Sequence, residues 1–381
     1  MRAVTLYVTG RCNLRCSHCA VGPDQEDPRE ELDTSQLKAV LSRLADGGAR
    51  FATILGGEAT MYRRDLAELL DHAHLVGLAV SINTNATVYR VLEPLLAKPA
   101  LQSLVVSLDG ARPETHDAMR GPRTFRRTTD TLRRVVTHPR AMDGSLGLEL
   151  SYVISKANWR DAGEMVVLAS ELGARQLNAK HVKLTGRALD NVSELELTSA
   201  ELLEAYSTMI VTWLLSGRKV ALDVHVPPAL AYYLNTRFGL DYPIDDHPAC
   251  GGIGEFGYVD LTGNYLPCPG LSLEEDPEFG LADHLPEVNL LDRAVDGIQG
   301  TELFTEFEER RQNKAYTQQI FPCKVCRFNH LTRPCTVDLV RGKEEMEVDI
   351  CRAVFESGDE HVPGLRDYVF PDAAVLGEHQ R

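Results

Sequence analysis

The chain has 381 residues, of which 44% are hydrophobic and 25% are charged, a composition typical of a globular protein with an ample core. Its formal net charge of −15 argues against a general nucleic-acid-binding protein, because binding to phosphates requires a basic surface. Met1 leads directly into a short strand-like run rather than a long apolar signal segment. The most apolar helix candidate, Leu202 to Leu215, contains Glu204 and is too short to span a bilayer. We therefore expect a cytoplasmic protein with neither nucleic acid nor membrane as a partner.

From residue 3 to about residue 190, short β-rich runs alternate with amphipathic helical patterns. The expected strands are Ala3–Val8, Ala52–Leu55, Leu78–Ile82, Leu104–Leu108, Leu148–Ile154 and Leu177–Leu184. Apolar residues spaced i, i+3, i+4 and i+7 indicate helices between them, with faces formed by Leu37, Val40, Leu41 and Leu44, by Leu66, Leu69, Leu70 and Ala73, and by Ala162, Met165, Val166 and Ala169. Strands that alternate with helices form a parallel sheet with right-handed crossovers.

About six such units are too few to close an eight-fold barrel. We therefore predict an α/β fold in which residues 1–197 form a partial (β/α)6 TIM-like barrel. After about residue 198 the pattern changes to one long helix followed by prolines and scattered cysteines. Residues 198–381 are expected to form a smaller, cysteine-rich domain whose order depends on bound metal.

Cys12, Cys16 and Cys19 lie on one loop directly after the first expected strand. Nine cysteines in a chain without a recognisable export signal favour metal or redox chemistry over disulfides. Three thiolates on a short loop suit an iron–sulfur cubane, which offers four iron corners and would keep one open for chemistry. The alternative is a zinc site, but zinc normally takes four protein ligands, and His18 is too close to the cysteines to swing round independently.

Other candidate site residues follow the carboxyl ends of later strands, where active sites of parallel α/β folds lie. Gly56, Gly57 and Glu58 follow the second strand, and two glycines there let the backbone approach a ligand closely. Asn83 and Asn85 follow the third strand, and Ser107 ends the fourth. His116 and Asp117 come next, and for both we favour helix capping or loop fixing over catalysis.

The three-residue and two-residue gaps between Cys12, Cys16 and Cys19, with the ring residue His18 before the last, resemble the signature of the radical S-adenosylmethionine (radical SAM) superfamily. The resemblance implies a 4Fe-4S cluster that binds S-adenosylmethionine and cleaves it to a 5'-deoxyadenosyl radical. Leu55 to Ala59 resembles the superfamily's Gly-Gly-Glu-Pro element, with Ala59 in place of proline. The cofactor-binding residues implied in this way are Gly56, Gly57, Glu58, Ser107, His18 and Asn85.

The remaining cysteines resemble those of a C-terminal SPASM domain, which holds auxiliary iron–sulfur clusters. They are Cys250, Cys268, Cys323, Cys326, Cys335 and Cys351. The chain departs from the full pattern because eight residues without a cysteine separate Cys326 from Cys335, and six cysteines are too few for two complete cubanes.

Two allocations of these cysteines remain open. In the favoured one, Cys250, Cys268 and Cys335 hold one cluster and Cys323, Cys326 and Cys351 hold another, with His330 or a water filling a gap. In the other, the shortened twitch domain, Cys250, Cys268, Cys323 and Cys326 hold a single cluster. A zinc ribbon is the remaining alternative for this half.

The expected function is hydrogen abstraction from a small polar metabolite, such as a sugar, aminocyclitol or nucleoside, leading to a two-electron oxidation or an epimerisation in a biosynthetic pathway. The reason is that only eleven residues precede Cys12, which leaves no room there for the peptide-binding domain of many peptide-modifying relatives. A peptide or protein maturase with a separate leader-binding partner is the first alternative, and a non-catalytic metal-stabilised binding module is the second. An enzyme of this type would receive electrons from an external one-electron donor such as flavodoxin or ferredoxin.

Overall fold

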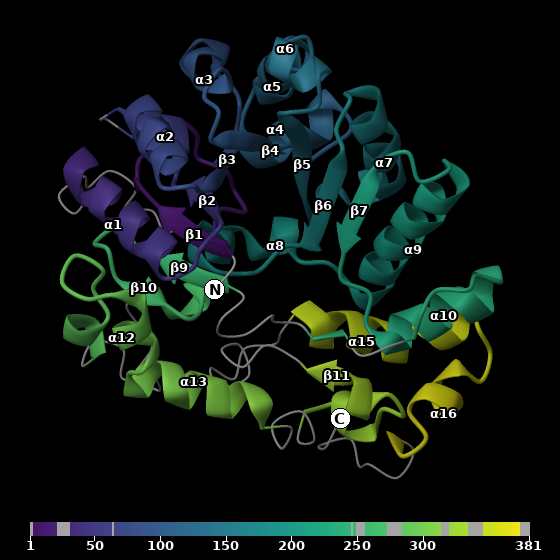
Figure 1. The fold of residues 1–381 in the computed structure, drawn as a ribbon. Helices are drawn as coiled ribbons and strands as arrows, with labels where there is room; N and C mark the ends of the chain where they lie inside the picture. Colours follow the sequence, from purple (N-terminus) through teal and green to yellow (C-terminus); the bar gives the residue numbers. More distant parts are fainter. Residues whose placement is uncertain are drawn as a thin grey trace.

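The computed structural model of the chain describes residues 3–20, 31–62, 65–244, 247–248, 256–272, 284–313, 320–333 and 346–373. Within these ranges nine strands form one curved sheet in the order β10-β9-β1-β2-β3-β4-β5-β6-β7 (Figure 1). The strands are β1 (Ala3–Tyr7), β2 (Phe51–Leu55), β3 (Ala79–Thr84), β4 (Leu101–Ser107), β5 (Gly147–Ile154), β6 (Gln176–His181), β7 (Ala221–Val224), β9 (Phe256–Val259) and β10 (Tyr265–Leu266). Neighbouring strands are parallel except β9 and β10, which are antiparallel.

Helices cover the outer face of this sheet, as Figure 1 shows for α1, α2, α3, α5, α7 and α9. The helices of the first 215 residues are α1 (Thr34–Asp46), α2 (Leu66–Leu75), α3 (Tyr89–Leu96), α4 (Pro113–Arg120), α5 (Thr124–Val135), α6 (Pro139–Met142), α7 (Ala162–Glu171), α8 (Val192–Leu195) and α9 (Ser199–Leu215). The core lies between these helices and the sheet, because alternate residues of the strands are fully buried there. The predicted α/β partial barrel is confirmed.

Helix α1 shows how the sequence pattern gives this layer. Asp33 and Gln36 form a capping box, in which each side chain accepts a hydrogen bond from the other residue's backbone N–H. Its predicted apolar face, with Leu37 as the first residue, is buried against the sheet. The predicted apolar faces of α2 and α7 are buried as well.

The six predicted strands are present, and the sheet continues beyond them on both edges. β7 extends the sheet beside β6, and β9 pairs with β1. These additional strands use the edge hydrogen-bonding groups that β1 and β6 would otherwise leave unpaired. β7 and β9 have only four residues each, and sequence patterns that short do not stand out. The division of the chain at residue 198 stays a prediction.

The remaining described elements lie below the open side of the sheet in Figure 1, with α12 and α13 at one side and α10, α15 and α16 at the other. They are α10 (Pro228–Phe238), α12 (Val295–Gln299), α13 (Glu302–Gln312), α15 (Met346–Ser357), α16 (Leu365–Val369) and the two-residue strands β8 (His247–Pro248) and β11 (Thr332–Arg333), which pair in parallel. Among the described residues, no helix combines the length and apolar character needed to cross a membrane.

Candidate active site

The cysteine loop follows β1 at the carboxyl edge of the sheet, and neighbouring segments hold it in place. On one side, Ser17 N donates to Met119 O at 2.9 Å. On another, Arg187 N donates to Cys19 O at 2.9 Å. The side chain of Asn13 donates to Thr87 Oγ1, also at 2.9 Å. The loop conformation is therefore set by contacts with residues distant in sequence.

Gly56 and Gly57 form the floor beneath the same loop. Gly57 N donates to Thr9 O at 2.8 Å, so the backbone that follows β2 is in contact with the backbone that follows β1. A Cβ on Gly57 would lie 2.6 Å from both Gly10 O and Arg11 O, and one on Gly56 would lie 2.6 Å from Thr9 O. Such distances are not tolerated without movement, so both positions require glycine for close backbone approach.

Glu58 ties the end of β2 to the end of β3. Its Oε2 accepts from Asn85 N at 2.7 Å, and its Oε1 accepts from Thr84 Oγ1 at 2.7 Å and from Thr60 Oγ1 at 2.7 Å. The carboxylate is buried, and a buried carboxylate is stable only with such donors. Glu58 thus has a structural role that the sequence did not indicate, while its predicted support of the cofactor amine stays a prediction.

The two predicted asparagines differ in their surroundings. Asn85 is buried, and its amide donates to Asn13 Oδ1 at 2.8 Å while accepting from the backbone and hydroxyl of Thr87. Asn83 lies within β3, and its buried Oδ1 has no hydrogen-bond partner in the part of the chain that the structure describes. Asn83 is therefore better suited than Asn85 to bind a ligand directly, because an unsatisfied acceptor is available for it.

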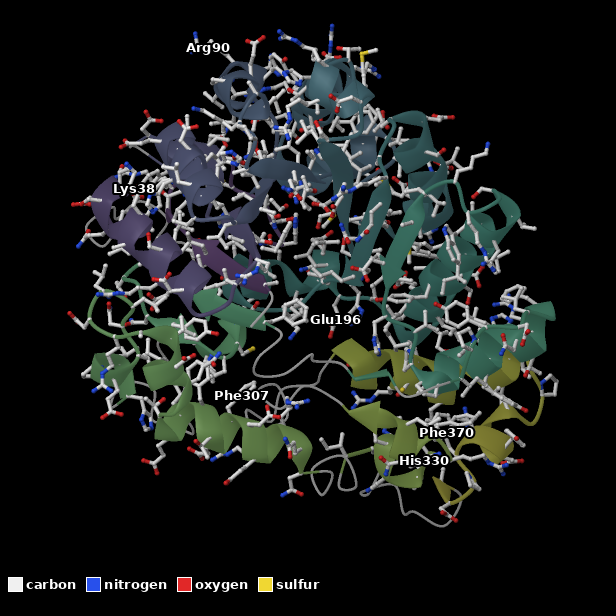
Figure 2. All side chains as sticks on the ribbon, in the orientation of Figure 1. Lys38, Arg90, Glu196, Phe307, His330 and Phe370 are labelled. Atoms are coloured by element: carbon white, nitrogen blue, oxygen red, sulfur yellow. The ribbon has the colours of Figure 1, made fainter. Side chains whose placement is uncertain are left out.

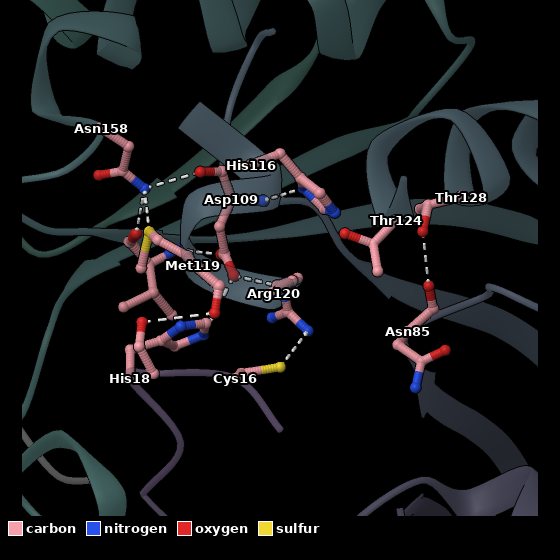
Figure 3. A network of polar contacts seen from close by, with 12 residues as sticks. Cys16, His18, Asn85, Asp109, His116, Met119, Arg120, Thr124, Thr128 and Asn158 are labelled. Carbon is pink, nitrogen blue, oxygen red and sulfur yellow. Dashed lines mark hydrogen bonds and ion pairs between the residues drawn. The ribbon is translucent and has the colours of Figure 1, made fainter. Parts of the chain in front are cut away.

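Asp109, two residues after β4, links the cysteine loop to α4 (Figure 3). Its Oδ2 lies 3.1 Å from Nε2 of His18 and accepts a hydrogen bond from Nε of Arg120, while its Oδ1 accepts from Val153 N at 2.9 Å. Burial by itself would raise the pKa of Asp109, but Arg120 and His18 outweigh it and hold the pKa well below its usual range. The aspartate therefore stays ionised within the protein.

Arg120 extends this network to a cysteine. It is the last residue of α4, and its Nη1 lies 3.9 Å from Sγ of Cys16 (Figure 3). Burial raises the pKa of the Cys16 thiol to about 11, whereas the guanidinium of Arg120 acts in the opposite direction. The cation thus faces the sulfur that would carry negative charge as a metal ligand.

The predicted loop-fixing roles of His116 and Asp117 are confirmed. Nδ1 of His116 accepts from Asp109 N at 3.1 Å, and its ring packs edge-on against Phe125. Asp117 accepts from Phe125 N at 2.7 Å and from Arg123 N at 2.6 Å, so its carboxylate caps the start of α5. Burial lowers the pKa of His116 to about 4, which keeps the ring neutral near neutral pH.

The donor set around this loop fits an iron–sulfur cluster. The three thiols are near enough to influence one another, since Cys19 raises the pKa of both Cys12 and Cys16, after the larger effect of burial. Within the described ranges, no three His, Cys, Asp or Glu side chains converge closely enough to hold a single metal ion. Zinc ligands must all converge on one ion. The thiolates of a cubane each bind a different iron atom, so they do not need to converge in this way.

Tyr7, at the end of β1, belongs to none of the sequence motifs described above. Its hydroxyl is buried and has no hydrogen-bond partner among the described residues. Burial raises the pKa of Tyr7 strongly, and Tyr258, Cys19 and Cys12 raise it further. Alternation along β1 is the one sequence signal that could have found it, because Tyr7 lies on the opposite face of the strand from the core residues Val4 and Leu6. Tyr7 is a second unsatisfied polar group beside the cysteine loop.

Four of the auxiliary cysteines lie within the described residues, at two places in the fold. Cys268 follows β10, whereas Cys351 lies in α15 on the other side of the lower half (Figure 1). The segment that carries Cys323 and Cys326 packs against α15, where the rings of Phe321 and Phe355 are 4.8 Å apart and edge-on. Cys323 and Cys326 thus lie on the same side as Cys351. The predictions for Cys250 and Cys335 concern residues outside the described ranges.

Of the other predicted site residues, Ser107 is the last residue of β4 and lies at the carboxyl edge, as expected. His330 is solvent-exposed, and Figure 2 labels it in the lower part of the molecule. Contact of Ser107 with S-adenosylmethionine and ligation of an auxiliary cluster by His330 both stay predictions.

Comparison with known proteins agrees with this geometry. The sequence profile of the Radical SAM superfamily matches residues 6–148, the range that contains the end of β1, the cysteine loop and strands β2 to β4. The PqqA peptide cyclase of Xanthomonas campestris pv. campestris (strain B100) is 30% identical over 292 residues, which cover 74% of this chain and 72% of the cyclase. The chain belongs to the radical SAM superfamily.

Two further proteins extend the likeness of this radical SAM chain beyond the barrel. The mycofactocin maturase MftC of Mycobacterium tuberculosis (strain ATCC 25618 / H37Rv) is 28% identical over 315 residues, which cover 80% of this chain and 72% of the maturase. The crystal structure of Streptococcus suis SuiB bound to S-adenosylmethionine covers 89% of this chain and 74% of SuiB, with a TM-score of 0.64 and 18% identity. The 381-residue chain is thus a radical SAM enzyme with a C-terminal part of the SPASM or twitch type. It uses a 4Fe-4S cluster, S-adenosylmethionine and one or two auxiliary clusters.

The expectation of a small polar metabolite as substrate is wrong. The relatives named above are a cyclase of the PqqA peptide and a maturase, and none is named for a sugar, aminocyclitol or nucleoside. The expectation rested on the short stretch before Cys12. That length does not decide the substrate class, since a separate chain can supply the recognition of a peptide leader.

Proposed function

We propose that this chain is a peptide maturase that modifies a ribosomally made precursor peptide. The observation that carries the proposal is its 28–30% identity, over 70–80% of its length, to enzymes named mycofactocin maturase and PqqA peptide cyclase. Those relatives align with both the barrel and the cysteine-rich part, so the likeness is not limited to the cofactor site.

In this proposal Cys12, Cys16 and Cys19 hold the 4Fe-4S cluster. When bound, the cluster and S-adenosylmethionine supply a 5'-deoxyadenosyl radical that removes one hydrogen atom from the substrate. Gly56 and Gly57 bring their backbone next to the cysteine loop at the carboxyl edge of the sheet, where the methionyl end of the cofactor would bind with Ser107. Asn83 and Tyr7 offer unsatisfied polar atoms at the same edge.

The work of the remaining residues is to fix this site rather than to react. Glu58 and Asn85 connect the β2 and β3 ends, while Asp109 and His18 connect β4 to the cysteine loop. Rigid support of this kind matters because a radical is unselective, so the protein must present one C–H bond to it and exclude water.

For the auxiliary clusters we propose two ligand groups, one including Cys268 and one including Cys323, Cys326 and Cys351. The contact of Phe321 with Phe355 supports this division, because it puts the Cys323–Cys326 segment beside α15. Cys250 and Cys335 complete the first group in the allocation that the sequence favours.

The proposed reaction is a two-electron oxidation of the peptide, in which a new bond forms at a carbon that has lost hydrogen. The substrate then loses two hydrogens overall, one as an atom and one as a proton, and an auxiliary cluster held by the C-terminal cysteines would accept the remaining electron. The name cyclase in the relatives supports oxidation over epimerisation, because closing a ring between two existing positions removes two hydrogens. A one-electron donor such as flavodoxin or ferredoxin would reduce the cluster.

Co-expression of the chain with precursor peptides encoded beside its gene tests the proposal. A peptide lighter by the mass of two hydrogen atoms supports it, and the Cys16→Ala variant serves as the control that leaves the peptide unchanged. Modification without a mass change, with one solvent deuterium gained in deuterated water, would indicate epimerisation instead. A peptide that stays unmodified with active, S-adenosylmethionine-cleaving enzyme would contradict the proposal.

A further inference from the structure

Arg120 connects two features that the proposed function leaves unrelated, a buried carboxylate and a cysteine of the loop. Its Nε donates to Oδ2 of Asp109, and its Nη1 lies 3.9 Å from Sγ of Cys16. Only 11% of its side-chain surface is exposed, and Asp109 is fully buried. Because the two contacts use different nitrogens of one planar guanidinium, both can be present at the same time.

Two elements fix the position of this cation. Arg120 ends α4, and the residue before it, Met119, accepts a hydrogen bond from Ser17 N, so the end of the helix is attached to the cysteine loop itself. Asp109 is held in turn by Val153 N at 2.9 Å, and its backbone carbonyl accepts from the Asn158 amide at 2.8 Å (Figure 3). The guanidinium therefore stands at a defined place beside Cys16, whereas an exposed arginine would sample many.

We propose that Arg120 is a positioning residue that sets the reduction potential of the 4Fe-4S cluster. The inference rests on the proposed ligation of that cluster by Cys12, Cys16 and Cys19. Reduction adds one negative charge to the cluster, and a nearby cation stabilises the reduced form more than the oxidised form. Hydrogen bonds to ligand sulfurs and net charge near the cluster are among the factors that set iron–sulfur potentials. Arg120 therefore raises the potential and makes reduction by a biological donor easier.

Asp109 has two opposing effects in this arrangement. It orients the guanidinium toward Cys16, yet its own negative charge partly cancels the positive charge of Arg120. His18 also faces the carboxylate, at 3.1 Å. Neutralising Asp109 while keeping Arg120 should therefore move the potential upward, opposite to the loss of Arg120. If the ion pair of Arg120 and Asp109 had only a structural role, the two losses of charge would not be expected to shift the potential in opposite directions.

The test is an anaerobic redox titration followed by electron paramagnetic resonance. The signal to be followed is the one that changes when S-adenosylmethionine is added, because this separates the cluster of the cysteine loop from auxiliary clusters. We expect Arg120→Gln to shift its midpoint potential to lower values, Arg120→Lys to shift it less, and Asp109→Asn to shift it upward. Arg112→Gln is the matched control, because Arg112 pairs with the buried Asp161 at 3.0 Å at the other end of α4.

The outcomes distinguish this inference from the proposed function. An Arg120→Gln midpoint equal to that of wild type and Arg112→Gln would overturn the inference, and so would shifts of the same sign in Arg120→Gln and Asp109→Asn. If Arg120→Gln does not assemble a cluster, Arg120→Lys and Asp109→Asn still decide the question, since equal midpoints in both and in wild type exclude it. A wild-type protein without any S-adenosylmethionine-sensitive signal would contradict the cluster assignment itself.

Discussion

Oε2 of Glu58 accepts a hydrogen bond of 2.7 Å from the backbone N–H of Asn85, which joins the ends of β2 and β3 beneath the cysteine loop. Residues that make such contacts hold the site together, and they differ from residues whose polar atoms are available to a ligand. Glu58 and Asn85 both direct their polar atoms into the protein, whereas Oδ1 of Asn83 has no partner within the described ranges. Substitution of Asn85 should therefore mainly lower stability, whereas substitution of Asn83, two residues away, should mainly slow catalysis.

The asparagine pair gives the first prediction. Asn85→Ala removes three side-chain hydrogen bonds in a buried loop, so we expect it to lower the free energy of unfolding by about 2–3 kcal/mol. Asn83→Ala should change that free energy by less than about 1 kcal/mol but slow deoxyadenosine formation by a factor of about 10, as expected for one lost ligand hydrogen bond. Denaturant unfolding and single-turnover assays measure the two effects. Equal loss of stability in both variants would show that Asn83 is structural.

The glycine floor gives the second prediction. Gly57→Ala places a Cβ 2.6 Å from Gly10 O and Arg11 O, so the cysteine loop must move, and we expect fewer irons bound after anaerobic reconstitution. Gly297→Ala is the matched control, because a Cβ there has no atom within 4 Å and alanine favours the helix α12. Iron analysis of both variants checks the contrast. Normal iron content in Gly57→Ala would mean that the loop tolerates displacement.

The cysteines give the third prediction. Replacement of Cys12, Cys16 or Cys19 by alanine should remove about four irons and abolish cleavage of S-adenosylmethionine. Cys351→Ala should remove auxiliary iron but leave the S-adenosylmethionine-sensitive resonance signal in place. In the wild-type protein about twelve irons indicate three cubanes and about eight indicate two. Loss of that signal in Cys351→Ala, in folded protein, would contradict the separation of the two sites.

His116 gives the fourth prediction, on pH. Its pKa of about 4 in the folded protein lies below the ordinary value of 6.5, so the unfolded chain binds a proton more readily as pH falls. Its stabilising contribution is complete above pH 6.5 and is lost as pH falls toward 4. Between pH 7.5 and pH 5.5 the loss amounts to about 1 kcal/mol in the free energy of unfolding. Anaerobic denaturant unfolding of the wild type and His116→Gln should show that excess loss in the wild type alone. The same pH dependence in both proteins would exclude His116 as its source.

Periodic and local features of this chain were predictable from sequence. The apolar face of α1, the position of Ser107 at a strand end and the capping by Asp117 all follow from spacing and local chemistry, and the structure has each of them. The cysteine loop was recognisable because its three ligand residues lie within eight positions of one another. Local rules suffice when the residues that interact are close in sequence.

Contacts between distant segments were not predictable in the same way. The approach of Arg120 to Cys16 spans 104 positions, and the hydrogen bond from Asn85 to Glu58 spans 27. Each depends on which strand ends become neighbours in the sheet. The sequence could not tell Asn83 from Asn85 for the same reason, because hydrogen bonding to Asn13 and Thr87 arises only in the folded chain. The prediction of a small-metabolite substrate was wrong because the length of chain before Cys12 carries no information about a peptide-binding partner that is a separate protein.

The most direct test of peptide maturation follows deuterium from substrate to cofactor. Cells that carry the gene are grown in deuterated medium, and their peptide and small-molecule fractions are offered separately to the reduced enzyme with S-adenosylmethionine. A peptide maturase should transfer deuterium from the peptide fraction to 5'-deoxyadenosine, and this transfer should disappear when the fraction is first digested with protease. Deuterium transferred from the small-molecule fraction, and unaffected by protease, would contradict peptide maturation.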